Sequence, residues 1–273
     1  MVGGSLPGGV NGRTEAHSYV AGRALGAYAR SAMARRLCLI STSTVFGTRY
    51  LEHAFPELRD TLGDVRRVLF VPYALQDRDA YAAKARAAFE EMGYGLDSLH
   101  EAFDQRRAIE KAEAIFCGGG NSFRLLKTLY ELEVLPLIRR RVTEGMVYSG
   151  ASAGSNLACP TIRTTNDMPI VEPPSLSALD LVSFQINPHY LDPAPGSTHM
   201  GETRETRIRE FHEENEIPVL GLREGAILRV EEGSVLLKGA AGARIFRRGE
   251  EPVEVVPVAP IESLVEPGTR RSA

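Results

Sequence analysis

A serine flanked by small residues stands at the centre of the segment Gly-Ala-Ser-Ala-Gly at positions 150–154. A short apolar run at 146–148 precedes the segment and a helix-compatible stretch at 155–158 follows it, so Ser152 is expected on a tight turn between a strand and a helix. Small neighbours let the backbone turn sharply and expose the hydroxyl, as nucleophilic catalysis from such a turn requires. The pattern therefore indicates a serine nucleophile, with a glycine-rich packing turn as the alternative.

A second small-residue segment, Gly-Gly-Gly-Asn at 118–121, follows the apolar run 114–117. The carboxyl ends of neighbouring parallel strands line the ligand crevice of an open α/β sheet, which would bring this loop to Ser152. The N–H groups of Gly120 and of Ala153 are then the expected donors to a developing oxyanion. A phosphate cradle is the competing interpretation, but the loop lacks the third spaced glycine of a dinucleotide site and the Gly-Lys-Ser/Thr ending of a P-loop.

One of the six histidines is placed to act as the base that a serine nucleophile needs. His189 follows the apolar segment 179–186 and the dipeptide Asn-Pro, so a proline-stiffened strand end would hold its imidazole at the sheet edge of Ser152. The other five are expected in the N-terminal extension, in a loop, or in helices and surface positions where solvation is the ordinary role: His17, His199, His53, His100 and His212.

The base in turn needs a carboxylate that fixes its tautomer and stabilises the imidazolium. Glu224 lies just beyond an expected strand at 217–222, and Asp167 and Asp192 are its rivals. The residues alone leave this choice open.

The elements that must position these groups alternate along the first half of the chain. Short β-rich runs predict buried strands at 37–40, 67–71, 114–117 and 146–148. Stretches with the apolar spacing of helices lie between them at 79–92, 105–111 and 122–141. This alternation predicts βαβ units and hence an α/β fold, a three-layer sandwich with a mainly parallel sheet.

The pattern changes after Asn156. Prolines punctuate the polar stretch 160–174, and long loops of this kind are usually functional. A charged helix is expected at 203–212, and short strands follow at 217–222, 226–230, 234–237 and 243–246. We interpret these strands as a C-terminal antiparallel edge, and the chain as a single domain over 36–257 with a peripheral tail at 258–273.

The composition is that of an ordinary globular protein, with 43% hydrophobic and 25% charged residues among 273 and a formal net charge of -3. The near balance of charge argues against nucleic acid or an anionic membrane as the main partner, and no apolar run approaches the roughly 20 residues that span a bilayer. The three cysteines (Cys38, Cys117 and Cys159) have no Cys-x-x-Cys spacing, which predicts buried thiols in the reducing cytoplasm rather than a disulfide framework or a zinc site.

The first 35 residues differ in kind from the rest. Five arginines and a single acid, Glu15, lie between positions 13 and 36. A targeting peptide would be basic and poor in acids, but a secretion signal also needs a continuous apolar core, which this stretch lacks. The favoured interpretation is a disordered or spurious extension, with Met33 as the natural start.

Several of these segments together resemble the peptidase E family of aspartyl dipeptidases, which are serine peptidases unrelated to chymotrypsin or subtilisin. The resemblance rests on the glycine loop, the serine turn and three further motifs, and it covers roughly residues 36–249 in order. The further motifs are Leu-Ala-Cys-Pro-Thr-Ile-Arg-Thr-Thr-Asn-Asp-Met-Pro-Ile at 157–170, Asn-Pro-His at 187–189 and Gly-Glu-Thr-Arg-Glu at 201–205.

The resemblance implies a fold similar to the class I glutamine amidotransferases, which carry cysteine where this chain has Ser152. It implies a Ser-His-Glu triad, with Glu224 favoured over Asp167 as the acid, and Gly120 and Ala153 as oxyanion donors. It also implies cleavage of Asp-X dipeptides through an aspartyl-enzyme, with no metal or organic cofactor. The implied triad is Ser152, His189 and Glu224.

Recognition of an N-terminal aspartate needs a cation for the side chain and an anion for the free amino group. On the family pattern Arg204 is the natural carboxylate clamp, Arg163 a second candidate, and Asp167 suits the ammonium group. The alternative for Arg204 is a surface ion pair, because it lies among charged residues on an expected helix.

The sequence departs from the family pattern at three positions: Ala151, Arg223 and Ala226. These departures bear on substrate range and turnover. The competing functions are a cyanophycinase-like hydrolase of β-aspartyl peptides and a non-catalytic binding protein on an amidotransferase-like scaffold. The expected partner is a small peptide, bound by a monomer or homodimer.

Overall fold

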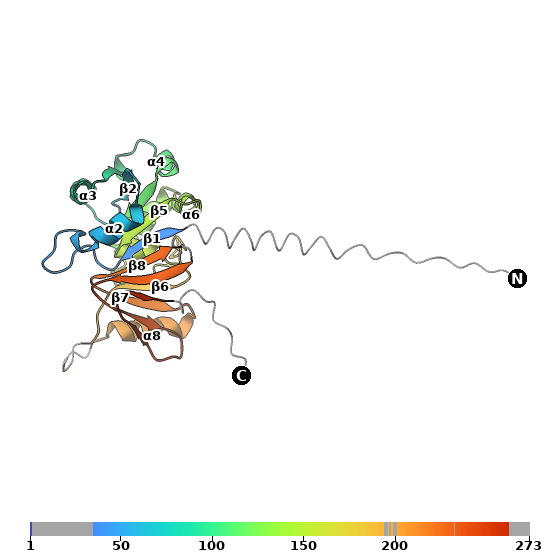
Figure 1. The fold of residues 1–273 in the computed structure, drawn as a ribbon. Helices are drawn as coiled ribbons and strands as arrows, with labels where there is room; N and C mark the ends of the chain where they lie inside the picture. The colour runs from blue at the N-terminus through green and yellow to red at the C-terminus, as the bar shows by residue number, and fades with distance from the viewer. Residues whose placement is uncertain (2–34, 194–195, 197, 199–200, 232, 262–273) are drawn as a thin grey trace.

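The structure is a computed structural model, and it describes residues 1, 35–193, 196, 198, 201–231 and 233–261. The expectations for His17, Met33 and His199 lie outside the described residues. Figure 1 shows one body built from two sheets, with β7 and α8 at the end away from α3 and α4.

The main sheet has eight strands in the order β12-β9-β8-β1-β5-β4-β2-β3. Strands β1 to β5 run parallel to one another, as the βαβ alternation predicts, and β8 pairs antiparallel with β1. The parallel strands are β1 (Arg36–Ile40), β2 (Arg67–Val71), β3 (Gly95–Ser98), β4 (Ala114–Cys117) and β5 (Val147–Ala151). The antiparallel edge is β8 (Ala226–Glu231), β9 (Ser234–Gly239) and β12 (Ala259–Pro260).

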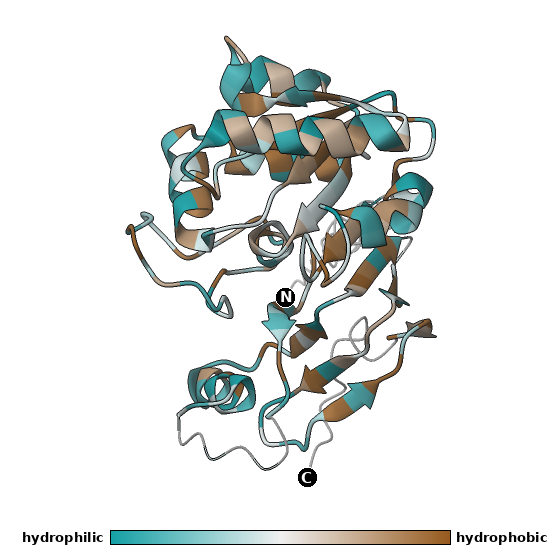
Figure 2. Ribbon diagram, turned by 90° about the vertical axis from the view of Figure 1, so that its left-hand side faces the viewer, coloured by the Kyte–Doolittle hydropathy of each residue, from teal (hydrophilic) through white to brown (hydrophobic). Residues whose placement is uncertain are grey.

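Helices cover both faces of this sheet because successive strand residues point to opposite sides. On one face Cys38, Ile40 and Phe116 pack with the helices α2 (Phe55–Leu62) and α3 (Arg78–Met92). On the other face Leu39 and Ile115 pack with α4 (Gln105–Lys111), α5 (Ser122–Glu131), α6 (Leu135–Thr143) and α7 (Ala153–Leu157). Two short 3-10 helices, η1 (Glu52–Ala54) and η2 (Leu99–Glu101), complete this part of the chain. Figure 2 shows brown apolar residues along the strands and a mixture of teal and brown on the helices.

A smaller sheet carries the order β11-β10-β7-β6. Its strands are β6 (Gln185–Tyr190), β7 (Val219–Arg223), β10 (Ala243–Phe246) and β11 (Val253–Val255), and β6 runs parallel to β7. One face of this sheet joins the core of the main sheet through Ile186, Leu222 and Ile245. The other face packs on α8 (Arg204–Glu214) through Tyr190 and Ile208.

The predicted α/β fold with an antiparallel edge is confirmed. The expectation that the C-terminal strands all belong to this one edge is wrong. The antiparallel edge of the main sheet contains β8 and β9, whereas β7 and β10 belong to the smaller sheet. The reason is the sharp connection after β7, where Gly225 has a φ of 85°. This turn sends the chain from one sheet to the other.

Further elements differ from expectation, and α2, β11 and β12 were not predicted. The expected helix 122–141 is two helices, because Glu133 adopts a left-handed φ of 54° and Pro136 lies in the first turn of α6. The strand β3 was not expected, since its sequence Gly-Leu-Asp-Ser carries little apolar character. Among the described residues, no helix has the length and apolar character to cross a membrane.

Candidate active site

Ser152 lies on the turn between β5 and α7 with a φ of 52° and a ψ of -108°. This backbone conformation is uncommon for a residue with a side chain, and such strain persists only where the surroundings enforce it. Two glycines permit the turn by close approach. An added Cβ at Gly150 would lie 2.5 Å from the carbonyl oxygen of Gly154, and one at Gly154 would overlap the carbonyl oxygen of Cys117.

The same turn is held by a backbone bond to β1 and by side chains of β5 and α7. The Ser152 N–H donates to the carbonyl oxygen of Ile40 at 2.9 Å, and Tyr148 Oη donates to the Gly154 carbonyl at 2.7 Å. Ser155 Oγ lies 2.8 Å from the Gly150 carbonyl oxygen. These buried bonds fix the position of the Ser152 hydroxyl at the carboxyl edge of the main sheet.

His189 reaches Ser152 from the smaller sheet. Its Nε2 lies 2.8 Å from Ser152 Oγ and its Nδ1 lies 2.8 Å from Glu224 Oε1. The pairing of β6 with β7 shifts register between Pro188 and Tyr190, and His189 has a φ of 53°. A bulge of this kind re-aims a side chain, which here turns the imidazole toward the serine.

Of the three acids left open by the sequence, the structure brings Glu224 to the histidine. The Asp192 carboxylate instead pairs with Arg223, with Nε–Oδ2 at 2.7 Å and Nη2–Oδ1 at 2.9 Å. These hydrogen bonds lower the pKa of Asp192. Asp167 bonds to residues at the start of α5, which pack on the other side of the site.

The two expected oxyanion donors flank the serine. Gly119 lies against Ser152, because a Cβ added there would be 3.1 Å from Ser152 Cβ. Gly120 follows with a φ of 131°, and Ala153 is the first residue of α7. Neither the Gly120 nor the Ala153 N–H donates to any residue that the structure describes. Both N–H groups are therefore available to a substrate oxygen.

Asp167 is held through one of its two oxygens. Its Oδ2 accepts from the Ser122 N–H at 2.7 Å, from Ser122 Oγ at 2.7 Å and from Thr165 Oγ1 at 3.0 Å. Asn121 Nδ2 also donates to the Met168 carbonyl at 2.8 Å, which ties this loop to α5. The Asp167 Oδ1 has no hydrogen-bond partner within the described part of the chain, so one lone-pair face is left for a cation.

Arg204 is the first residue of α8 and is half-buried. Burial lowers the pKa of Arg204, Arg207 lowers it further, and the charge of Asp167 acts in the opposite direction. Arg204 forms no hydrogen bond or ion pair with a described residue. Its acidic neighbours are engaged elsewhere, since Glu202 pairs with Arg207 and Glu205 pairs with Arg209 and Arg244.

Arg163 is placed differently from Arg204. Its side chain is exposed and has no hydrogen bond or ion pair with the residues that the structure covers. The backbone N–H of Arg163 donates to Thr161 Oγ1 at 3.3 Å. The geometry therefore gives Arg163 no contact with the other expected site residues.

Comparison with known proteins identifies the family of the chain. Residues 37–238 match the model of peptidase family S51. The chain belongs to this family. It is 52% identical over 230 residues to peptidase E of Streptomyces coelicolor, covering 84% of this chain and 95% of the relative. It is 47% identical over 238 residues to a Drosophila melanogaster protein named "Probable alpha-aspartyl dipeptidase", covering 86% and 99% of the two chains.

Solved structures give the same architecture. A crystal structure of a peptidase from an acI-B1 Actinobacterium superposes with a TM-score of 0.62 at 16% identity. The match covers 86% of this chain and 99% of the other. At this identity the likeness supports the fold of the present chain and gives no information about its substrate.

Two residues of this S51 protein that contact the site were not predicted from the sequence. Ser41 is buried, accepts the His189 N–H at 3.0 Å and donates to the Leu222 carbonyl at 2.6 Å. A polar run, Ser-Thr-Ser-Thr at 41–44, follows the first expected strand, and this was the available signal. Tyr81 contacts the glycine loop from α3, and nothing in the spacing of that helix distinguishes it.

Two of the remaining histidines have structural contacts. His100 lies 2.7 Å from Ser98 Oγ and 2.9 Å from Asp79 Oδ1. His212 is buried, against the expectation of a solvated position, and its Nδ1 lies 3.1 Å from the Asn215 carbonyl oxygen.

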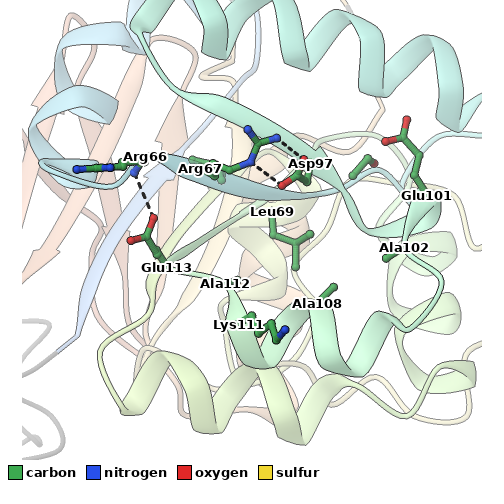
Figure 3. Close-up of a pocket in the computed structure, with 12 residues that line it drawn as sticks. Arg66, Arg67, Leu69, Asp97, Glu101, Ala102, Ala108, Lys111, Ala112 and Glu113 are labelled. Carbon is green, nitrogen blue, oxygen red and sulfur yellow. Dashed lines mark hydrogen bonds and ion pairs between the residues drawn. The ribbon is translucent and has the colours of Figure 1, made fainter.

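A cavity of about 700 Å³ lies elsewhere, at the amino ends of the parallel strands (Figure 3). Arg67 is paired with Asp97 in this cavity, and the backbone N–H of Arg66 donates to Glu113 at 3.2 Å. Since Arg67 begins β2 and Ser152 follows the end of β5, parallel strands place this cavity and the serine at opposite sheet edges.

Proposed function

We propose that this protein is a serine-type dipeptidase that removes an N-terminal aspartate from Asp-X dipeptides through an aspartyl-enzyme. The observation that carries the proposal is the hydrogen-bonded chain from Ser152 through His189 to Glu224, with 2.8 Å at each link. The names of the relatives from Streptomyces and Drosophila support the substrate class.

Acylation follows from the geometry. Glu224 accepts a hydrogen bond from the Nδ1–H of His189, which leaves Nε2 with a lone pair directed at Ser152 Oγ. The serine loses its proton to Nε2 as Oγ attacks the aspartyl carbonyl carbon. The oxyanion accepts hydrogen bonds from the Gly120 and Ala153 N–H groups, and the amine leaves with the proton from Nε2.

Deacylation reverses the roles of the same groups. A water molecule gives its proton to His189 Nε2 and attacks the aspartyl ester, and Ser152 recovers its proton as aspartate leaves. Every proton in this cycle moves between Ser152, His189, water and the amine. The chemistry therefore requires neither a metal nor an organic cofactor.

Recognition of the aspartyl residue is assigned to two groups of opposite charge. Arg204 would bind the side-chain carboxylate through its guanidinium, because its acidic neighbours are already paired. Asp167 would bind the free ammonium through the oxygen that has no described partner. Arg163 is the less suitable clamp, since its side chain is exposed.

We also propose a cytoplasmic location and a small peptide as the working partner, bound by a monomer or homodimer. The three cysteines are buried and unpaired, which suits a reducing compartment. The formal net charge of -3 gives no support to nucleic acid or an anionic membrane as a partner.

The test is hydrolysis of Asp-Leu by the wild type and by Ser152→Ala, with Ser183→Ala as a control at an exposed serine. The Ser152 variant should lose activity by about 10⁴-fold or more, whereas the control should match the wild type. Unchanged hydrolysis by Ser152→Ala would contradict the assignment. Cleavage of β-Asp-Arg in preference to Asp-Leu would instead favour a cyanophycinase-like function.

A further inference from the structure

A cavity of about 580 Å³ lies on the other side of the glycine loop from Asp167. Gly119 and Gly120 form one wall of it, and α3, the segment 75–77, Ser43 and Tyr50 form the rest. Asp167 is bonded to Ser122 at the start of α5, which packs on the opposite face of the main sheet. The proposed oxyanion donor Gly120 therefore stands between the aspartyl-binding groups and this second cavity.

The walls of this cavity combine apolar surface with one cation, Lys84, and one carboxylate, Asp77, which accepts the Ala80 N–H as the cap of α3. Tyr50, Leu75 and Ala80 provide the apolar part. Lys84 is an exposed residue of α3, and its Nζ lies 4.9 Å from the centre of the Tyr50 ring. No carboxylate among the described residues forms an ion pair with Lys84, so its charge is not neutralised by the protein.

We infer that this cavity is the subsite for the leaving amino acid, and that Lys84 binds the free carboxylate of the dipeptide. The inference rests on the proposed function and deepens it. A dipeptide carries its free carboxylate one residue beyond the scissile carbonyl, a Cα–Cα step of about 3.8 Å. An oxyanion held by Gly120 would therefore place that carboxylate in the cavity that Gly120 lines.

The chemistry of the cavity matches that ligand. The long, flexible ammonium side chain of Lys84 suits a carboxylate whose position varies with the leaving residue. The apolar wall around Leu75 suits the side chain of an apolar leaving residue. Recognition of a terminal carboxylate at this point explains a restriction to dipeptides, because a longer peptide would present an uncharged amide there.

The experiment compares Asp-Leu with its C-terminal amide, Asp-Leu-NH2, which lacks the carboxylate. The variants are Lys84→Met, which keeps the apolar stem, Lys84→Arg, which keeps the charge, and Lys111→Met as a matched control. Lys111 is an exposed lysine at the opposite sheet edge. Thermal unfolding of each variant checks that the fold is retained.

Lys84→Met should lower kcat/KM for Asp-Leu by about tenfold to a hundredfold, the effect of losing a hydrogen bond between charged groups. Its kcat/KM for Asp-Leu-NH2 should change by less than twofold, whereas Lys84→Arg and Lys111→Met should behave as the wild type on both substrates. An equal loss on both substrates, or no loss on either, would overturn the subsite while leaving the dipeptidase function standing. If the wild type cleaves neither substrate, the proposed function fails and the subsite fails with it.

Discussion

The hydroxyl of Tyr81 occupies the space that a side chain at Gly118 would fill, and a Cβ added at Gly118 would overlap that oxygen. The backbone of Gly119 lies close enough to the same hydroxyl to lower its pKa, against the larger effect of burial. Burial raises the pKa of Tyr81 to about 12, so the phenol stays neutral at ordinary pH. The phenol therefore packs directly against the glycine loop that carries the proposed oxyanion donor, Gly120.

We predict that Tyr81→Phe lowers kcat by about tenfold with little change in KM, because the glycine loop loses its anchor and the oxyanion donor is less well placed. Tyr94→Phe is the matched control, since the Tyr94 hydroxyl lies 3.3 Å from the carbonyl oxygens of Arg59 and Gly63 and belongs to neither the glycine loop nor the proposed subsite. Steady-state kinetics on Asp-Leu make the comparison. Equal kcat values for Tyr81→Phe and the wild type would show that the loop holds its shape without this hydroxyl.

Glu224→Gln should lower kcat by about a hundredfold, because the amide no longer stabilises the imidazolium that forms on His189. The expected loss is smaller than for a buried triad acid, since the Glu224 side chain is 50% exposed and water can partly replace it. Glu254→Gln is a suitable control, as its carboxylate pairs with Arg223 and does not touch His189. A Glu224 variant with full activity would remove this residue from the proposed triad.

Arg204→Met should lower kcat/KM for Asp-Leu by about a hundredfold and abolish the preference for Asp-Leu over Asn-Leu, because the proposed carboxylate clamp is lost. Arg207→Met tests whether any charge on α8 suffices, and Arg163→Met tests the other clamp candidate. Both should retain the preference for aspartate. If Arg163→Met alone abolished it, the clamp would have to be reassigned.

Acid should weaken the contact between Asp192 and Arg223. The hydrogen bonds from Arg223 lower the pKa of Asp192 in the folded protein. The carboxylate therefore contributes stability above its unfolded pKa of about 3.9 and loses that contribution as the pH falls through the lower folded pKa. Asp192→Asn should reduce the free energy of unfolding by about 0.5–1 kcal/mol at pH 7, as expected for a partly exposed pair. Urea titrations should show this difference shrinking as the pH is lowered from 5 toward 2.

The arrangement of Ser152 and Gly120 was accessible from the sequence because both follow apolar runs that form adjacent parallel strands. Strands β4 and β5 pair directly, so their carboxyl ends must lie together. His189 was accessible for a different reason, since it follows an apolar segment and the dipeptide Asn-Pro, which stiffens the end of a strand. Its aim depends on a bulge with a left-handed φ, which no periodicity in the sequence encodes.

The choice among the acids could not be made from spacing, because it depends on which sheet each strand joins. Glu224 reaches His189 since β7 lies beside β6 in the smaller sheet, whereas the sequence suggested one continuous antiparallel edge. The sequence likewise could not show that Arg204 forms no ion pair with a described residue. That outcome depends on the neighbouring acids pairing with Arg207, Arg209 and Arg244.

The bonds of Ser41 tie the two sheets together at the point where the serine and the histidine meet. Ser152 follows β5 of the main sheet, whereas His189 lies in β6 of the smaller sheet and Glu224 follows β7, so the reacting pair spans a seam between the two sheets. A slip of about 1 Å along that seam would be enough to reduce turnover a hundredfold without unpairing a strand. Turnover therefore depends on the relative position of the two sheets. As urea is added, kcat should fall at a lower urea concentration than the circular dichroism signal of the strands.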